Sequence, residues 1–226
     1  MQVFMALWIG FGLVYKHDLS SYWTTDAVTS TPFFSMQMSR NRFEQILSML
    51  HLNDNANHVA RGDPGHDPLF KVRPIYDMLR NKFRDIYVPD RDVSLDEGMC
   101  PWKGRVSFKV YNPMKPDRFG MKLHQICESR SSYCVGFDVY TGSGYDPNPD
   151  AADGEVDQGQ SHQVVMGLLR HCRLLGKGYR VYMDNYYSSP TLFDTLRNND
   201  TMPCGTVRLN RKEMPAALKK KLNTGS

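Results

Sequence analysis

Apolar residues recur at helical spacing in the first part of the chain and at strand-like spacing in the second. Helices are expected over residues 1–16, from Ser39 to His51, and from Pro74 onward, with a loop over residues 53–69. The apolar start lacks a basic segment and is shorter than the roughly 20 residues needed to span a bilayer. We interpret it as a buried helix and expect no membrane partner.

From Asp92 onward the pattern is that of short strands. The expected strands cover residues 92–96, 105–111, 121–127, 133–139, a run ending at Asp184, and 202–209. Ser161 is expected to cap a helix through Leu175, and another helix follows Pro190. Antiparallel strands followed by alternating helices and strands predict an α/β (α+β) fold, in the order of an RNase H-like core.

Two parts of the chain are predicted from this change of pattern. Residues 1–90 form a mainly helical N-terminal part, and residues 91–226 form the core. Residues 141–160 are rich in Gly, Pro and Asp and are expected to form a flexible acidic loop within the core.

Two aspartates, Asp96 and Asp184, each follow a strand-like run and are the candidate catalytic and metal-binding residues. Sheets of this class present their chemistry at strand ends. Paired carboxylates suit Mg²⁺ or Mn²⁺, and two such ions can activate the attacking oxygen and stabilise the leaving oxygen of a phosphodiester. Each Asp can also simply cap a turn or a helix, and that alternative stays open. Glu97 is expected to point to the opposite face of its strand.

Charge is unevenly distributed along the chain, although the net charge is only +4. Residues 71–130 have a net charge of +5 and residues 161–226 one of +7, while residues 131–160 have one of −6. Each basic block contains one of the two aspartates, which suits a polyanionic substrate. The candidate DNA phosphate contacts are Lys103, Arg105, Lys115 and Lys122. A merely solvated surface is the alternative for each.

The five cysteines are scattered and contain no CxxC pair. Because their number is odd and their spacing fits neither zinc binding nor a disulfide framework, a reducing compartment is expected.

Several short motifs together resemble those of piggyBac-type transposases and the proteins derived from them. Each motif alone is weak, but they follow one another in family order over nearly the whole chain. The matching stretches are residues 39–43 (SRNRF), 93–97 (VSLDE), 102–105 (WKGR), 111–116 (YNPMKP), 119–122 (FGMK), 183–189 (MDNYYSS), 205–208 (GTVR) and 211–212 (RK).

The resemblance implies a cut-and-paste DNA transposase with an RNase H-like catalytic domain. The family site uses three aspartates and two divalent metal ions, Mg²⁺ or Mn²⁺. Asp96 matches the first aspartate and Asp184 the second. The third belongs on a later helix that is absent here, so we expect a truncated core, incomplete at the C-terminus. The implied partner is DNA at transposon ends, bound with low specificity by such a fragment. A homodimer and a nuclear location are also implied.

Three functions remain open at this level. The first is a transposase-derived protein whose incomplete site is inactive and holds no metal. The second is a domesticated, non-catalytic DNA-binding or scaffold protein that uses only the basic surface. The third is a nuclease that takes its missing metal ligand from another side chain. The candidates for that ligand are His162, Asp153, Glu155 and Asp157.

Overall fold

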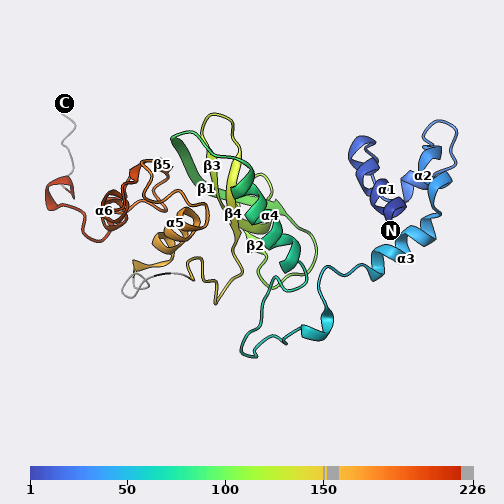
Figure 1. Cartoon of the computed structure of the whole chain (residues 1–226), viewed down its shortest axis with the longest axis horizontal. Helices are drawn as coiled ribbons and strands as arrows, with labels where there is room; N and C mark the ends of the chain where they lie inside the picture. The colour runs from blue at the N-terminus through green and yellow to red at the C-terminus, as the bar shows by residue number, and fades with distance from the viewer. Residues whose placement is uncertain (150, 152–157, 220–226) are drawn as a thin grey trace. The chain divides into compact units, whose positions relative to one another are not determined.

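The computed structural model describes residues 1–149, 151 and 158–219 (Figure 1). The chain forms two compact units, residues 1–57 and 58–226. Each unit is described by itself below. The acidic residues Asp153, Glu155 and Asp157, together with most of the predicted acidic loop, lie outside the described residues.

The first unit is helical, as the apolar spacing predicts. Ser39 begins one of its helices as a cap, because its hydroxyl accepts a hydrogen bond from the backbone N–H of Arg42 at 3.3 Å. α2 and the two short 3₁₀ helices were not predicted from the sequence. The elements are α1 (Gln2–Leu13), η1 (Ser20–Trp23), α2 (Pro32–Gln37), α3 (Arg40–Met49) and η2 (Asn55–Asn57).

Aromatic side chains make up most of the core of this first unit. Phe4 stacks on Phe43 with ring centroids 4.7 Å apart, and Phe34 meets Tyr22 edge to face at 4.8 Å. The prediction that α1 is a buried helix is correct for one face only. Phe4 and Leu7 are fully buried, but Leu13 remains 83% exposed. In the described parts of the chain, no helix is both long and apolar enough to cross a membrane.

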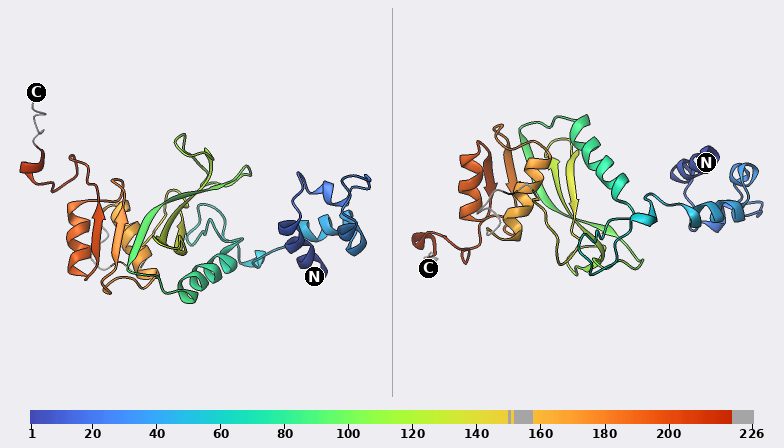
Figure 2. Two further views of the ribbon diagram at one scale, coloured as in Figure 1. Left: turned by 90° about the horizontal axis from the view of Figure 1, so that it is seen from above. Right: turned by 60° about the horizontal axis from the view of Figure 1, so that its bottom comes forward.

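The second unit is built on a six-stranded mixed sheet. The strand order is β2-β3-β1-β5-β6, and β4 pairs with β3 as well (Figures 1 and 2). Its helices are α4 (Arg73–Ile86), α5 (Gln160–His171), α6 (Pro190–Asn198) and the short η4 (Ala216–Lys219). The strands are β1 (Asp92–Pro101), β2 (Val110–Tyr111), β3 (Phe119–Glu128), β4 (Cys134–Val139), β5 (Arg180–Met183) and β6 (Met202–Gly205).

The sheet changes from antiparallel to parallel at β1. β3 pairs antiparallel with β1 and β4, whereas β5 is parallel to β1 and β6 is parallel to β5. α5 precedes β5, and α6 connects β5 to β6. Antiparallel strands followed by two parallel strands with intervening helices are consistent with the predicted RNase H-like order. The two compact units divide before α4, because α4 packs on β4 through Phe83, Tyr76 and Phe137.

One face of the sheet carries the main hydrophobic core. Val93 and Leu95 of β1 share this core with Ile126 of β3, Val181 of β5 and the apolar sides of α5 and α6. We call this side of the sheet the covered face. Because side chains alternate along a strand, Ser94 and Asp96 lie on the opposite face. Over β1, β5 and β6, that opposite face is the open face.

Three predicted strand boundaries were wrong, because the partner strand determines where a strand begins and ends. The strand predicted over residues 105–111 is reduced to Val110–Tyr111, because β4 pairs with residues 123–127 of β3 and leaves only the start of that edge to β2. The strand predicted over residues 202–209 ends at Gly205, where its partner β5 also ends. Conversely, β1 continues to Pro101, beyond the predicted end at Asp96, because β3 is long enough to pair with it.

Both predicted ends of α5 were wrong as well. Its N-cap is Gly159 rather than Ser161, and Ser161 lies within the first turn. The φ of Gly159 is 85°, in the left-handed region that favours glycine, so the chain turns sharply before the helix begins. The helix ends at His171 instead of the predicted Leu175.

Candidate active site

The two predicted aspartates lie beside each other on neighbouring parallel strands. Leu95 of β1 pairs with Met183 of β5, so the next positions along the two chains are Asp96 and Asp184. Neighbouring strands are about 4.8 Å apart, which sets the scale of the backbone separation. Both side chains are exposed, and both line one hollow of about 610 Å³ on the open face.

Two local features hold this register in place. Arg180 and Asp92 are register partners at the start of the β1–β5 pair, and their side chains form an ion pair at 2.6 Å. On the other side of β5, Gly205 allows β6 to approach closely. A Cβ at that position would lie 2.2 Å from the carbonyl oxygen of Met183, so a larger residue would push the strands apart.

Asp184 also orders the turn that follows β5. Its Oδ1 accepts a hydrogen bond from the backbone N–H of Tyr186 at 2.9 Å. Its carbonyl oxygen accepts bonds from both the backbone N–H and the hydroxyl of Ser188. The turn-capping alternative is therefore correct for Asp184, and it coexists with exposure of the carboxylate on the open face.

Asp96 differs from its predicted setting at a strand end. It lies in the middle of β1, one residue past the last position that pairs with β5, and β1 continues alongside β3 alone. Its Oδ1 accepts the backbone N–H of Glu97 at 2.7 Å. The parallel ladder therefore ends at the two aspartates even though β1 itself does not.

Glu97 is the link between Asp96 and the neighbouring basic residues. It is half-buried, and its carboxylate lies 3.3 Å from the ammonium of Lys122. Burial raises the pKa of Glu97, Lys122 opposes that shift, and the neighbouring carboxylate of Asp96, which accepts a hydrogen bond from protonated Glu97, adds to it. Glu97 is the register partner of His124, which places it on the covered face, as strand alternation predicts.

The four candidate phosphate contacts fall into two pairs. Lys115 donates a hydrogen bond to the carbonyl oxygen of Glu97 at 3.0 Å, so it lies with Lys122 at the residue that follows Asp96. Lys103 and Arg105 lie on the exposed loop between β1 and β2. The structure therefore gathers two of the four at Glu97, in a hollow that neither aspartate lines, and leaves the other two on a separate loop.

Three comparisons place this architecture among known proteins. A family profile described as Transposase IS4 matches residues 1–226. The human "PiggyBac transposable element-derived protein 3" is 31% identical over 207 residues, covering 88% of this chain and 33% of that protein. The human "PiggyBac transposable element-derived protein 2" is 29% identical over 193 residues, covering 85% of this chain and 31% of that protein.

The chain belongs to the piggyBac-type transposase family. It spans about a third of the length of these two curated relatives. A solved structure described as a piggyBac transposase synaptic complex with hairpin DNA has the same fold, with a TM-score of 0.77. It is 24% identical and covers 99% of this chain and 44% of that chain. The predicted family and fold are therefore confirmed.

The two aspartates have the right chemistry to bind a hard divalent cation, but they make up only part of the ligands that such a cation needs. Asp96 and Asp184 supply carboxylate oxygens on one exposed surface, which are ligands that Mg²⁺ and Mn²⁺ prefer. Within residues 1–149, 151 and 158–219, no group of three or more His, Cys, Asp or Glu side chains is placed to hold a metal ion. His162, a predicted alternative ligand, is buried on α5.

Two arginines near the site were missed by the sequence analysis. Arg208 donates a hydrogen bond to the side-chain oxygen of Asn185 at 2.9 Å, and Arg211 donates to the Asn185 carbonyl oxygen at 3.1 Å and to that of Tyr186. They therefore fix the turn that follows Asp184. Arg208 lies in the GTVR motif and Arg211 in the RK motif, so the sequence did mark both residues. The motifs do not show that these arginines bind the turn after Asp184.

A buried hydrogen-bonded pair next to Glu97 was also not predicted from the sequence. His124 and the hydroxyl of Tyr187 are hydrogen-bonded at 2.7 Å on the covered face. Burial, and then the charge of Lys122, lower the pKa of His124 to about 4, so the ring is neutral at neutral pH. Because the two residues are 63 positions apart, no local pattern in the sequence connects them.

Proposed function

We propose that this chain carries part of a divalent-metal phosphodiester-transfer site, with Asp96 and Asp184 as two of its carboxylate ligands. The proposal rests on one observation, the parallel register that ends at Leu95 and Met183, one residue before the two aspartates. When bound, Mg²⁺ or Mn²⁺ would activate an attacking oxygen and neutralise charge on the leaving oxygen. The chain's own contribution is to hold both carboxylates on one solvent-accessible surface.

The surrounding residues have supporting roles in this proposal. Arg208 and Arg211 fix the turn after Asp184 and so orient its carboxylate. Lys122 and Lys115 are held at Glu97, where their charges attract the phosphates of a DNA strand approaching Asp96. Lys103 and Arg105 extend this basic surface along an exposed loop. DNA is therefore the proposed substrate, and the nucleus is the proposed location.

We further propose that these 226 residues alone do not cleave or join DNA. Two carboxylates would leave two Mg²⁺ ions with an excess of positive charge and too few fixed ligands. Mg²⁺ demands near-octahedral geometry, so water in place of a fixed ligand would loosen the site. Misplacing reacting groups by about 1 Å can cost on the order of 100-fold in rate.

Manganese binding tests the metal site without requiring activity. Titration of Mn²⁺ into the chain, followed by the loss of the free-ion electron paramagnetic resonance signal, should show binding that Mg²⁺ displaces. Asp96→Asn and Asp184→Asn should each abolish it. Asp63→Asn is the matched control, because Asp63 is exposed on a loop of the same unit and does not line the hollow that holds the two aspartates. Equal Mn²⁺ binding in all four proteins would overturn the proposed ligands.

DNA cleavage assays then separate the chemical proposals. The chain with Mg²⁺ or Mn²⁺ should leave DNA carrying related transposon ends uncut. Metal-dependent cutting that disappears in Asp184→Asn would show that these residues already contain a third ligand.

A second candidate function is a DNA-binding module that does not use metal, and a homodimer is its proposed assembly. The observation favouring it is the exposed pair Lys103 and Arg105, which lies on a separate loop from the aspartates. This function predicts DNA binding that is unchanged by chelation of metal and by Asp96→Asn. The metal-site proposal instead predicts that Mn²⁺ strengthens binding only when both aspartates are present. Sedimentation of the chain with and without DNA would report the oligomeric state.

A further inference from the structure

Two cysteines face each other across the hairpin formed by β3 and β4. Cys127 of β3 is the register partner of Cys134 of β4. Because paired residues of an antiparallel ladder point to the same face, both thiols lie on the side of the sheet opposite the covered face. Cys134 donates a hydrogen bond to the sulfur of Cys127, so the two sulfur atoms are within hydrogen-bonding distance of each other.

The spacing of paired strand positions suits a bond between these sulfurs. Directly paired residues have Cα atoms about 4.5–5.5 Å apart, and disulfides span Cα separations of about 4.4–6.8 Å. The Cβ atoms, about 4.5–5.5 Å apart, must come slightly closer to reach the roughly 3.5–4.5 Å of a disulfide. The backbone can supply this movement because the register shifts here. Ile126 pairs with Gly136, which leaves Val135 as an extra residue in β4.

The turn that joins the two strands keeps the cysteines opposite each other. The backbone N–H of Glu128 donates to the carbonyl oxygen of Tyr133 at 2.9 Å, and the N–H of Ser132 donates to the carbonyl oxygen of Glu128 at 3.0 Å. The buried carboxylate of Glu128 accepts further bonds from the hydroxyl of Tyr87 and the backbone N–H of Ser131. Because this turn is short and internally bonded, little conformational entropy is lost when a covalent bond closes it.

We propose that Cys127 and Cys134 form a reversible redox site, in which mild oxidation joins their two sulfur atoms in a disulfide. Both side chains are half-buried, so a small oxidant such as hydrogen peroxide can reach them. The proposal does not depend on metal or DNA binding. A disulfide that pulls paired strand positions together is strained, and strained disulfides are the ones that thiol reductants open readily.

The oxidation takes two steps. The thiolate of Cys127 attacks one oxygen of the peroxide, the O–O bond breaks, and a sulfenic acid forms on Cys127. The hydroxide that leaves takes up the proton that Cys127 gave up, which yields one water. The sulfur of Cys134 then attacks the sulfur of the sulfenic acid, and the S–S bond forms as the S–OH bond breaks. The proton of Cys134 leaves with that hydroxyl as a second water.

The different surroundings of the two thiols support this order of steps. The hydrogen bond from Cys134 lowers the pKa of Cys127 to about 7, while burial and the charge of Asp96 act in the opposite direction. The same hydrogen bond, together with burial, raises the pKa of Cys134. Cys127 therefore supplies the thiolate, which is the reactive form, and Cys134 is the second thiol to react.

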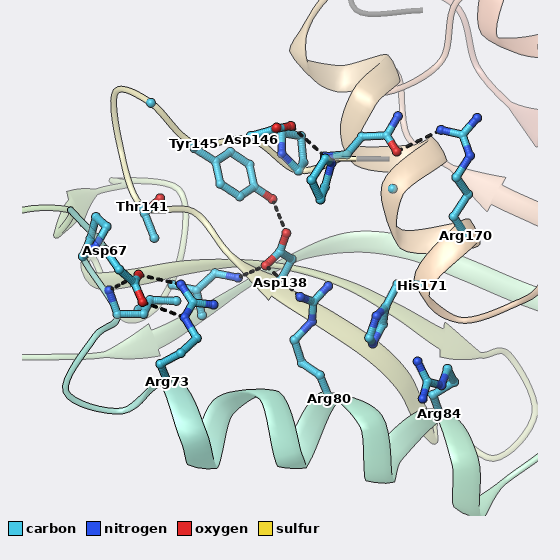
Figure 3. Close-up of a pocket in the computed structure, with 18 of the residues that line it drawn as sticks. Asp67, Arg73, Arg80, Arg84, Asp138, Thr141, Tyr145, Asp146, Arg170 and His171 are labelled. Carbon is cyan, nitrogen blue, oxygen red and sulfur yellow. Dashed lines mark hydrogen bonds and ion pairs between the residues drawn. The ribbon is translucent and has the colours of Figure 1, made fainter. Parts of the chain in front are cut away.

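The disulfide would fasten the start of β4, whose other end is already held. Near that end, Asp138 accepts hydrogen bonds from the hydroxyls of Tyr76 and Tyr145. Its carboxylate also lies 3.9 Å from Arg80, which projects from α4 (Figure 3). With both ends of β4 fixed, its backbone amides should exchange their hydrogens with solvent more slowly.

Peptide mapping of the full chain tests the bond directly. The chain is reduced, treated with hydrogen peroxide, blocked with N-ethylmaleimide and digested with trypsin in the absence of reductant. Mass spectrometry should find the peptides of Cys127 and Cys134 joined with the loss of two hydrogens, and a thiol reductant should separate them. Trypsin leaves Cys127 in residues 123–130, Cys134 in residues 131–170 and Cys172 in residues 171–173.

Cys172 is the competing partner for Cys134. A Cβ at Gly136 would lie 2.3 Å from the sulfur of Cys172, so this thiol lies against β4 from the covered face. A bond between Cys134 and Cys172 would overturn the proposal. So would a Cys127–Cys134 bond found only in covalent dimers, or full labelling of both thiols by N-ethylmaleimide after the peroxide treatment.

Substitutions test the order of the steps. Cys134→Ser keeps a hydroxyl donor beside Cys127, so a sulfenic acid should accumulate on Cys127 and be trapped by dimedone. Trapping on Cys134 in Cys127→Ser should be several-fold lower, and equal trapping would overturn the assigned order. Cys204→Ser is the matched control, because Cys204 is exposed on β6, and it should leave the disulfide intact.

Hydrogen exchange tests the effect on β4. The amides of residues 134–139 should exchange several-fold more slowly in the oxidised parent chain than in the reduced one. Cys127→Ser treated with the same peroxide should show no such change. Equal exchange in the oxidised and reduced parent chains would show that the bond does not fasten this strand.

Discussion

The covered face and the open face of the same sheet are built for different purposes. On the covered face, Val93 and Leu95 are almost completely buried against α5 and α6. On the open face, the intervening Ser94 is half-buried and Asp96 is exposed. Alternation along β1 therefore places packing and candidate chemistry at adjacent positions. The packed side fixes the strand register, and the register brings the two carboxylates together.

The largest expected effect comes from a substitution that changes only the covered face. Leu95→Ala should lower the free energy of unfolding by about 2–5 kcal/mol, because it removes a buried side chain and leaves a cavity. The neighbouring Ser94→Ala should change it by less than about 0.5 kcal/mol. Denaturant unfolding of both variants measures the contrast. Similar losses in the two would mean that the open face is also packed in solution.

Lowering the pH should lower the free energy of unfolding through His124, which lies on the covered face. The folded pKa of His124 is about 4, below the value of about 6.5 in an unfolded chain. Between these values only the unfolded state takes up the proton, so stability falls as pH decreases through that window. The loss from this residue should approach about 3 kcal/mol at the lower end.

His124→Gln isolates that contribution, because Gln does not titrate and can still donate to the hydroxyl of Tyr187. Its unfolding free energy should depend less steeply on pH between about 6.5 and 4 than that of the parent chain. His171 also has a lowered pKa and should supply the slope that remains. Parallel pH profiles for the parent and His124→Gln would contradict this account of the buried ring.

The elements of the fold could largely be predicted because their signals are local. Ser39 and Ser189 cap helices in the structure, each accepting a backbone N–H three residues ahead. The aspartates were found because a strand-like run precedes each one. Strand ends were predicted less well, because the end of a strand is set by its partner. β1 continues past Asp96 only because β3 is there to pair with it.

The contacts that support the site could not be predicted, because they join distant positions. Nothing near Asn185 indicates that Arg208 binds it, and nothing near Glu97 indicates that Lys122 pairs with it. The same limit applies to Arg80 and Arg84. They are four residues apart and so lie on one side of α4, but nothing in the sequence shows that the end of α5 lies near them.

Binding to DNA should distinguish the exposed loop from the residues held beside Asp96. The double variant Lys103→Ala/Arg105→Ala should reduce the magnitude of the log–log salt slope by about 1.8, if each residue neutralises one phosphate. Overall stability should not change, because both side chains are exposed. Lys122→Ala should both weaken DNA binding and alter the surroundings of Glu97, since it removes the 3.3 Å ion pair.

Fluorescence anisotropy with a labelled duplex over a range of salt concentrations gives these slopes. The control is Lys177→Ala/Arg130→Ala, which removes two exposed charges elsewhere on the same unit. Identical slopes in both double variants would mean that DNA binding depends on net charge and not on the loop.

The smallest expected effect is a difference in reactivity between two cysteine thiols, one on each face of the sheet. Cys127 is the register partner of Ser94, so its side chain lies on the side of the sheet opposite the covered face. A hydrogen bond from Cys134 lowers the pKa of Cys127 to about 7, while burial and the charge of Asp96 act in the opposite direction. Cys172 is packed in the core, where burial raises its pKa to about 12.

The thiolate is the reactive form, so Cys127 should be alkylated by iodoacetamide at neutral pH while Cys172 is not. Mass spectrometry of peptides after brief exposure measures both sites in one sample. Cys134→Ala removes the donor and should move the apparent pKa of Cys127 upward, toward about 8.5, so that alkylation slows several-fold. Asp96→Asn should act in the opposite direction, because it removes a negative charge that disfavours the thiolate. Equal labelling of Cys127 and Cys172 would show that the two faces do not differ in the way the register implies.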